Sequence, residues 1–127
     1  MSRLFNVEVF NQTIGAAAPV YSSQEFYALL GSADVIVAQL VLDGVSATSA
    51  TEVTVTYQVN NTTQEQLWVD TPWNESVTAS NADDPPKQEA LVVPQGTDEH
   101  LGAFGRFKVT ADKGGASVRI IACGRST

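Results

Sequence analysis

The sequence predicts an all-β fold: a single-domain β-sandwich or jelly roll of seven to nine mostly antiparallel strands. Short runs alternate between apolar and polar residues, Gly, Pro, Asn and Asp interrupt them at short intervals, and only one segment has a helical pattern. A chain of 127 residues fits one domain, residues 1–127, and is long enough to bury a core. An open all-β barrel is the alternative that these patterns leave.

The first strand is expected over residues 3–10, where every second side chain from Phe5 onward is apolar. This strand could exchange with a neighbouring chain, because it starts close to the terminus and could add to another sheet edge. A loop rich in Gly and Ala is expected over residues 11–19. Residues 20–30 fit two interpretations: a short helix that begins near Ser22 with a capping box completed by Glu25, or a short strand.

A second strand, over residues 34–43, is predicted to carry apolar side chains on both faces. On one face they are Ile36, Ala38, Leu40 and Leu42, and on the other they are Val35, Val37 and Val41. Apolar side chains on both faces are typical of a central strand or of a strand that contacts another subunit.

The clearest alternation lies in residues 52–60, where Val53, Val55, Tyr57 and Val59 are separated by polar residues. This pattern predicts a strand with one buried and one solvated face. A turn at residues 60–63 should lead into a partner strand over residues 64–69.

Proline-containing turns are expected at Pro72 and at residues 81–86, on either side of a short edge strand over residues 75–80. Residues 87–93 should form a further strand, which Pro94 ends.

The last 24 residues predict a β-hairpin, with strands over 104–111 and 116–123 joined by the Gly-rich turn 112–115. Opposing Ala111 with Ala116 would place the apolar side chains on one face of the hairpin: Phe107, Val109, Val118 and Ile120. The other face would then carry the bases Arg106, Lys108 and Arg119.

The predicted hairpin also differs from the rest of the chain in net charge. Residues 1–103 hold two bases and 13 acids, a net charge of −11, whereas residues 104–127 hold five bases and one acid, a net charge of +4. Two interpretations of the basic face stay open: acids on neighbouring strands screen it, or it binds an acidic surface of a partner or of a second copy.

The same composition excludes several classes of function. A net charge of −7 argues against a nucleic-acid binder. We expect no membrane span, because the longest apolar run is far shorter than the roughly 20 residues required. We also expect no secretion signal, and therefore synthesis in a cytoplasm.

We expect no catalytic, cofactor or metal site. His100 is the only histidine, the acid pairs Asp83–Asp84 and Asp98–Glu99 lack the spacing of a calcium loop, and Cys123 has no second cysteine for a disulfide. A phosphate-binding Gly loop and a Gly-x-Ser-x-Gly elbow are both missing from the sequence.

Two tryptophans suggest a different kind of site. Trp68 and Trp73 lie on either side of residues 70–72, and exposed aromatic rings on a β-sandwich could stack on sugars. The alternative is that Trp68 packs in the core and that Trp73 anchors the loop onto it.

Residues 51–58, 67–70, 105–111 and 116–122 together resemble the small β-sandwich structural proteins of tailed-bacteriophage particles, which include capsid decoration, or cement, proteins. The resemblance lies in the order of strand, Trp, long loop, Arg-Phe-x-Val-Thr segment and terminal apolar strand, over about residues 51–123. It implies a non-enzymatic virion protein, made in the host cytoplasm, that binds the major capsid protein or other virion subunits as a homo-oligomer.

Within that interpretation, the candidate partner-binding residues are Arg106, Lys108, Arg119, Val35, Val37 and Val41. The alternative function is a carbohydrate- or receptor-binding module that uses Trp68 and Trp73.

Overall fold

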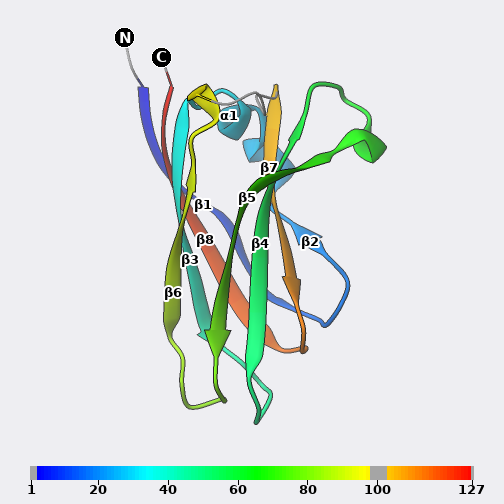
Figure 1. Ribbon diagram of the computed structural model, residues 1–127, viewed down its shortest axis with the longest axis vertical. Coiled ribbons are helices and arrows are strands. Elements are labelled where there is room, and N and C mark those ends of the chain that lie inside the picture. Colours follow the sequence, from blue (N-terminus) through cyan, green and yellow to red (C-terminus); the bar gives the residue numbers. More distant parts are fainter. Residues whose placement is uncertain (1–2, 98–102, 127) are drawn as a thin grey trace.

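The chain folds as a sandwich of two four-stranded antiparallel sheets, as predicted, in a computed structural model that describes residues 3–97 and 103–126 (Figure 1). The strands are β1 (Arg3–Ile14), β2 (Val20–Tyr21), β3 (Val35–Gly44), β4 (Thr51–Asn60), β5 (Val69–Ala79), β6 (Lys87–Val93), β7 (Phe104–Ala111) and β8 (Ala116–Ser126). The helical segments are η1 (Gln24–Phe26), α1 (Tyr27–Gly31), η2 (Glu65–Leu67) and η3 (Gln95–Thr97).

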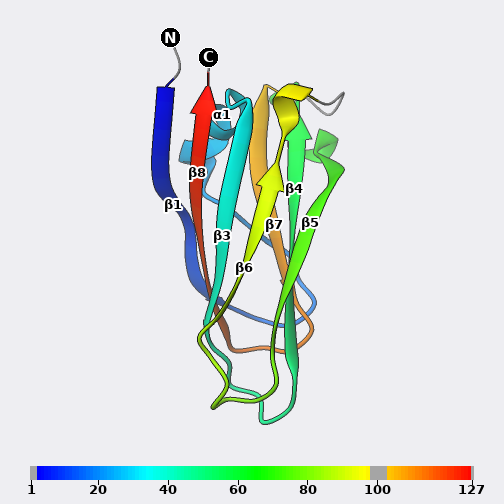
Figure 2. The same cartoon turned by 60° about the vertical axis from the view of Figure 1, so that its left-hand side comes forward.

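The strand order is that of a jelly roll. One sheet has the order β1-β8-β3-β6 and the other β2-β7-β4-β5, so the first strand pairs with the last, the second with the seventh, the third with the sixth and the fourth with the fifth. The chain is thus one long hairpin, with β4 and β5 at its tip, wound into two layers. Both layers are visible in Figure 2, where β1, β8, β3 and β6 form the nearer sheet.

The core lies between the two sheets and is built from the alternation that the sequence shows. In β3 and β4, which have neighbours on both sides, the side chains that point inward are almost completely buried: Ile36, Ala38, Leu40, Leu42, Val53, Val55 and Tyr57. The prediction that residues 34–43 form a central strand is therefore confirmed.

Strand β1 is longer than predicted, because it continues to Ile14 through what was expected to be a loop. A bulge between Glu8 and Phe10 shifts the register with β8, so that Val9 and Phe10 are both buried. In this structure β1 pairs with β8 of its own chain. Its other edge has no strand partner in the described sheet, and exchange with a neighbour stays a prediction.

Both interpretations of residues 20–30 are met in part, because Val20–Tyr21 form the short strand β2 and residues 24–31 are helical. The expected capping box is wrong: Ser23 occupies the N-cap of η1 and its side chain makes no capping hydrogen bond. Ser22 is instead buried and bridges to β7, because its Oγ accepts a hydrogen bond from the Phe107 N–H at 2.9 Å.

The prediction of a partner strand over residues 64–69 is wrong, since η2 occupies the middle of that segment. The true partner of β4 is β5, which begins at Val69 and runs through Pro72 to Ala79. Pro72 lies within this strand because β5 is at the sheet edge, where a missing N–H costs no ladder bond, and near a register shift between Thr56 and Gln58.

The prediction of a C-terminal hairpin is also wrong. Strands β7 and β8 are consecutive in the chain but belong to opposite sheets, so Ala111, which ends β7, and Ala116, which begins β8, lie in different layers. The connection turns at Gly115, whose φ of +82° is a conformation that glycine adopts without strain and whose N–H donates to the Ile14 carbonyl at 2.9 Å. The apolar side chains expected on one hairpin face do line the core, but from its two opposite walls.

Candidate interaction surfaces

The shared basic face does not exist, because its residues belong to different sheets. Arg106 and Lys108 lie on β7, and Arg119 lies on β8 in the other layer. Each of the three is paired with an acid of its own chain. The interpretation in which neighbouring acids screen the bases therefore describes the contacts observed.

Arg106 is a buried residue, only 3% exposed, and sits at the centre of a cluster at one end of the sandwich. Its Nε donates to Gln58 Oε1 at 2.7 Å, and its Nη1 donates to Glu65 Oε1 at 2.6 Å. The guanidinium carbon lies 3.6 Å from the ring centroid of Tyr21 and 4.2 Å from that of Trp68. The planar cation is thus stacked between two aromatic rings, an arrangement that lysine could not reproduce.

The acids that pair with these bases are held in their ionised form. The hydrogen bond from Arg106 lowers the pKa of Glu65, and the hydrogen bond from Arg119 lowers the pKa of Asp43. The pKa of Asp70 is lowered first by a hydrogen bond from Gln58 and then by one from Lys108, whose Nζ lies 3.0 Å from both carboxylate oxygens.

The outer surface of the β1-β8-β3-β6 sheet is unusually apolar for a solvent-facing surface. In its central row, Val37 on β3 lies directly opposite Val92 on one side and Cys123 on the other. Val37 is 46% exposed and Val92 51% exposed, and Cys123 is exposed as well. We call this surface the apolar face; its apolar side chains are Leu4, Val35, Val37, Val41, Ala90, Val92, Ile121 and Cys123.

The three valines expected to bind a partner all lie on the apolar face, although they differ in exposure. Val37 is exposed and Val35 is half-buried. Val41 is only 8% exposed and is paired with Arg119 and Gln88 on the two neighbouring strands. Val37 is therefore the most accessible of the three.

The apolar face is also close to electrically neutral. Its charged residues in the described register are two acids, Glu8 and Asp43, and two bases, Arg119 and Arg125, which sum to zero. Arg119 Nε donates to Asp43 Oδ2 at 2.6 Å, and its Nη1 lies 4.0 Å from Glu8 Oε2. Because the whole chain carries −7, the acidity is concentrated elsewhere.

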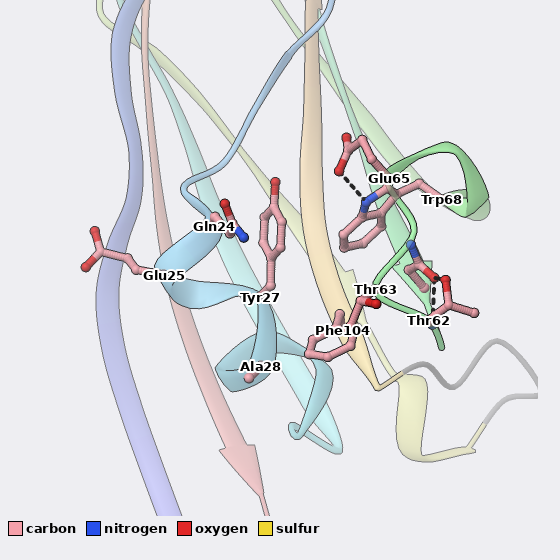
Figure 3. Close-up of a pocket in the computed structure, with 10 residues that line it drawn as sticks. Gln24, Glu25, Tyr27, Ala28, Thr62, Thr63, Glu65, Trp68 and Phe104 are labelled. Carbon is pink, nitrogen blue, oxygen red and sulfur yellow. Dashed lines mark hydrogen bonds between the residues drawn. The ribbon is translucent and has the colours of Figure 1, made fainter.

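A pocket of about 230 Å³ opens at the end of the sandwich, between α1 and the segment around η2 (Figure 3). Three aromatic side chains line it, Tyr27, Trp68 and Phe104, together with the polar side chains of Gln24, Glu25, Thr63 and Glu65. The Tyr27 and Trp68 rings meet edge to face, with centroids 5.0 Å apart. We call this the end pocket.

The two tryptophans have different surroundings. Trp68 is half-buried and lines the end pocket. Trp73 packs against the core, with its ring centroid 6.3 Å from that of Tyr57. The anchoring role considered for Trp73 fits these contacts, and a joint site formed by Trp68 and Trp73 stays a prediction.

Within residues 3–97 and 103–126, no three His, Cys, Asp or Glu side chains converge as metal ligands would. His100 and the pair Asp98–Glu99 lie outside the described residues. Among the described helices, none has the length and hydrophobicity to cross a bilayer.

Neither a protein-family model nor a curated protein sequence matches the chain. Solved structures do match its fold. A chain of turnip yellow mosaic virus superposes with a TM-score of 0.51 at 10% sequence identity, over 98% of this chain and 77% of that one. A chain of Desmodium yellow mottle tymovirus gives 0.49 at 8% identity, over 98% and 83% of the two chains. A chain from the disulfide-linked pili of Bacillus endospore appendages gives 0.46 at 12% identity, over 100% and 87%.

The chain is a jelly roll. At 10% identity, the likeness to the turnip yellow mosaic virus chain shows a shared fold and nothing about a shared site. It agrees with the strand order described above and with the sequence-based prediction of a sandwich or jelly roll.

Sequence reasoning missed several residues of both surfaces. Residues 90–93 are all apolar, so the sequence does not separate the exposed Ala90 and Val92 from the buried Leu91 and Val93. No local signal joins Tyr27 to Trp68, because these residues meet only when the helical segment folds over the end of the sandwich.

Proposed function

We propose that this chain is a non-enzymatic structural protein of a virus particle, which decorates or cements the capsid through protein–protein contacts. The observation that carries the proposal is the apolar face, where Val37, Val92 and Cys123 form an exposed row across three paired strands. Contiguous apolar surface on a rigid sheet is typical of a site that binds another protein.

The charges of the apolar face favour the same role. Its ion pairs are satisfied within the chain, so docking leaves few unpaired charges to desolvate. The partner we propose is the major capsid protein or another virion subunit, with self-association into a homo-oligomer in the host cytoplasm before docking on the virion. The jelly-roll fold supports the proposal only at the level of architecture.

Purified particles provide the direct test. The protein should be present in a fixed ratio to the capsid subunit, and recombinant protein should cosediment with particles stripped of it. Val92→Glu should weaken cosedimentation at least tenfold, because it would bury a carboxylate against an apolar surface. Val69→Glu is the matched control: Val69 is also an exposed edge-strand valine, 57% against 51%, but it lies on β5 of the other sheet.

Self-association is measured separately by sedimentation velocity, with the same two variants. An oligomer that Val92→Glu dissociates and Val69→Glu leaves intact would support a shared role for the apolar face. A monomeric protein that particles neither contain nor bind would refute the proposal.

A further inference from the structure

We propose that the end pocket binds one uncharged sugar ring, such as the terminal pyranose of a glycan. This function goes beyond capsid docking, because the pocket lies at the end of the sandwich and the apolar face lies on the side of one sheet (Figures 1 and 3). The proposal rests on the fixed orientation of Trp68, the polar groups around it, and the size and charge of the pocket.

The indole of Trp68 is held in place before any ligand arrives. Arg106 stacks against it at 4.2 Å, Tyr27 meets it edge to face at 5.0 Å, and its Nε1 donates to Glu65 Oε2 at 3.2 Å. Arg106 is in turn held by Gln58 and Glu65. A ring that is already ordered loses little conformational entropy on binding, so its stacking contributes more fully to affinity.

The pocket combines this aromatic wall with hydrogen-bonding groups on its rim. Gln24 comes from η1 and Thr63 from the turn after β4, and both are exposed and line the pocket, Gln24 beside Tyr27 and Thr63 near Trp68 (Figure 3). An amide and a hydroxyl can each donate and accept, as sugar hydroxyls require. The C–H groups on a pyranose face carry a slight positive charge and pack on the electron-rich face of an aromatic ring.

The size and charge of the end pocket restrict the kinds of ligand that it could bind. A volume of about 230 Å³ is below the range of about 300–1,000 Å³ typical of pockets for drug-sized molecules, and it suits a single ring. The charged side chains that line the pocket are Glu25 and Glu65, both acidic, which disfavours sialic acids and sulfated or phosphorylated sugars. Glu65 already pairs with Arg106, and Arg106 already covers one face of Trp68, so a cationic ligand would find these groups engaged.

The test is an NMR titration of the intact ¹⁵N-labelled chain with methyl glycosides of glucose, galactose, mannose and N-acetylglucosamine. The chain has two indole N–H signals, and Trp73→Phe identifies which belongs to Trp68. We expect at least one glycoside to shift the Trp68 signal in a saturable manner and to leave the Trp73 signal unchanged.

The double variant Gln24→Ala/Thr63→Ala should weaken that binding at least tenfold, because it removes rim groups without touching the core. Gln12→Ala/Thr78→Ala is its matched control: it removes the same two residue types from exposed positions on β1 and β5 and should leave the affinity unchanged. Circular dichroism melting curves verify that all variants stay folded.

Several outcomes would overturn the proposal. They are the absence of a Trp68 shift with every glycoside, binding that survives the Gln24→Ala/Thr63→Ala change, or a response to choline or sialic acid in place of neutral sugars. Particle cosedimentation of the double variant separates the two functions, since we expect capsid docking through the apolar face to be unaffected.

Discussion

Arg106 stacks on Trp68, with its guanidinium carbon 4.2 Å from the centroid of the indole ring. The contact joins the first residues of β7 to the segment around η2. The ring of Tyr21 packs on the same guanidinium, with its centroid 3.6 Å from the guanidinium carbon. One buried cation thus connects three segments that are far apart in the sequence. It also fixes the ring to which we assign sugar binding.

Arg106→Lys should destabilise the protein although it keeps the charge. Lysine cannot stack between two rings and bond Gln58 and Glu65 at once, so we expect the free energy of unfolding to fall by about 1–3 kcal/mol. Urea denaturation at neutral pH provides the measurement. The matched control is Arg125→Lys at an exposed position on β8, which should change the free energy by less than about 0.5 kcal/mol. Equal effects of the two changes would contradict a structural role for the stack.

Stability should fall in acid. The pKa values of Glu65 and Asp70 are lowered from their ordinary 4.5 and 3.8, so the unfolded chain binds more protons than the folded one as the solution is acidified. Their contribution is fully present above those ordinary values and is lost as the pH falls through the folded values. We therefore expect the urea midpoint to be nearly constant between about pH 7 and 5 and to drop below about pH 4.5.

Asp70→Asn tests the origin of that acid sensitivity. The variant keeps the size of the side chain but cannot be protonated, and its amide still permits one hydrogen bond with Gln58. It should be less stable than the native chain at neutral pH and should lose less stability on acidification. An unchanged acid profile would mean that Asp70 does not contribute.

Cysteine cross-linking can test the strand order. Thr54 and Thr110 are directly opposed on β4 and β7, where Cα atoms are about 4.5–5.5 Å apart, so cysteines there should form a disulfide on oxidation. Thr110 and Ser117 would be opposed in a β7–β8 hairpin but lie in different sheets. That second pair should stay reduced. Both pairs are made with Cys123→Ser, and free thiols are counted by maleimide labelling and mass spectrometry; a disulfide in the second pair would contradict the jelly-roll order.

Gln95 closes one end of the core and should be sensitive to substitution. Its buried Nε2 donates to the Leu30 carbonyl at 2.7 Å and to the Ala33 carbonyl at 2.6 Å, and its Oε1 lies 3.3 Å from the Tyr57 hydroxyl. Gln95→Met would leave both carbonyls without this donor and should lower the free energy of unfolding by roughly 2–4 kcal/mol. Gln12→Met, at an exposed position on β1, should have little effect. If thermal unfolding shows similar melting temperatures for the two variants, the buried amide is not a structural support.

Much of the secondary structure could be predicted from local patterns. Strand β6 has the predicted bounds, Lys87–Val93, and β4 differs from the predicted segment by one residue. Residues 52–60 alternate because a two-layer sandwich buries one face of the strand, whereas the bounds of β6 follow from the proline-containing segments on either side of it. The second apolar face of β3, which includes the exposed Val37, fitted a central strand or a subunit contact, and the sequence did not decide between them.

The wrong predictions concern segments whose structure depends on contacts with residues remote in the sequence and not on the local pattern. Residues 64–69 follow a turn and were expected to pair with β4, but η2 occupies the middle of the segment and Glu65 pairs there with Arg106. The inward-facing Val109 and Val118 fit a hairpin and also fit two strands in opposite sheets, because both arrangements bury the same side chains. Burial alone could not choose between them.

The amino-acid order by itself determined that this protein is an all-β domain and which side chains line its core, because alternation with a period of two can satisfy only a layered sheet. Only the tertiary structure decided that β8 pairs with β1 and β3 in place of β7, since strand partners are selected by contacts between segments remote in the chain. The same long-range packing dispersed the basic residues, gathered Val37, Val92 and Cys123 into one face, and brought Tyr27 to Trp68. Each of these surfaces joins residues from separate strands or helices, and no single segment carries the information that places them together.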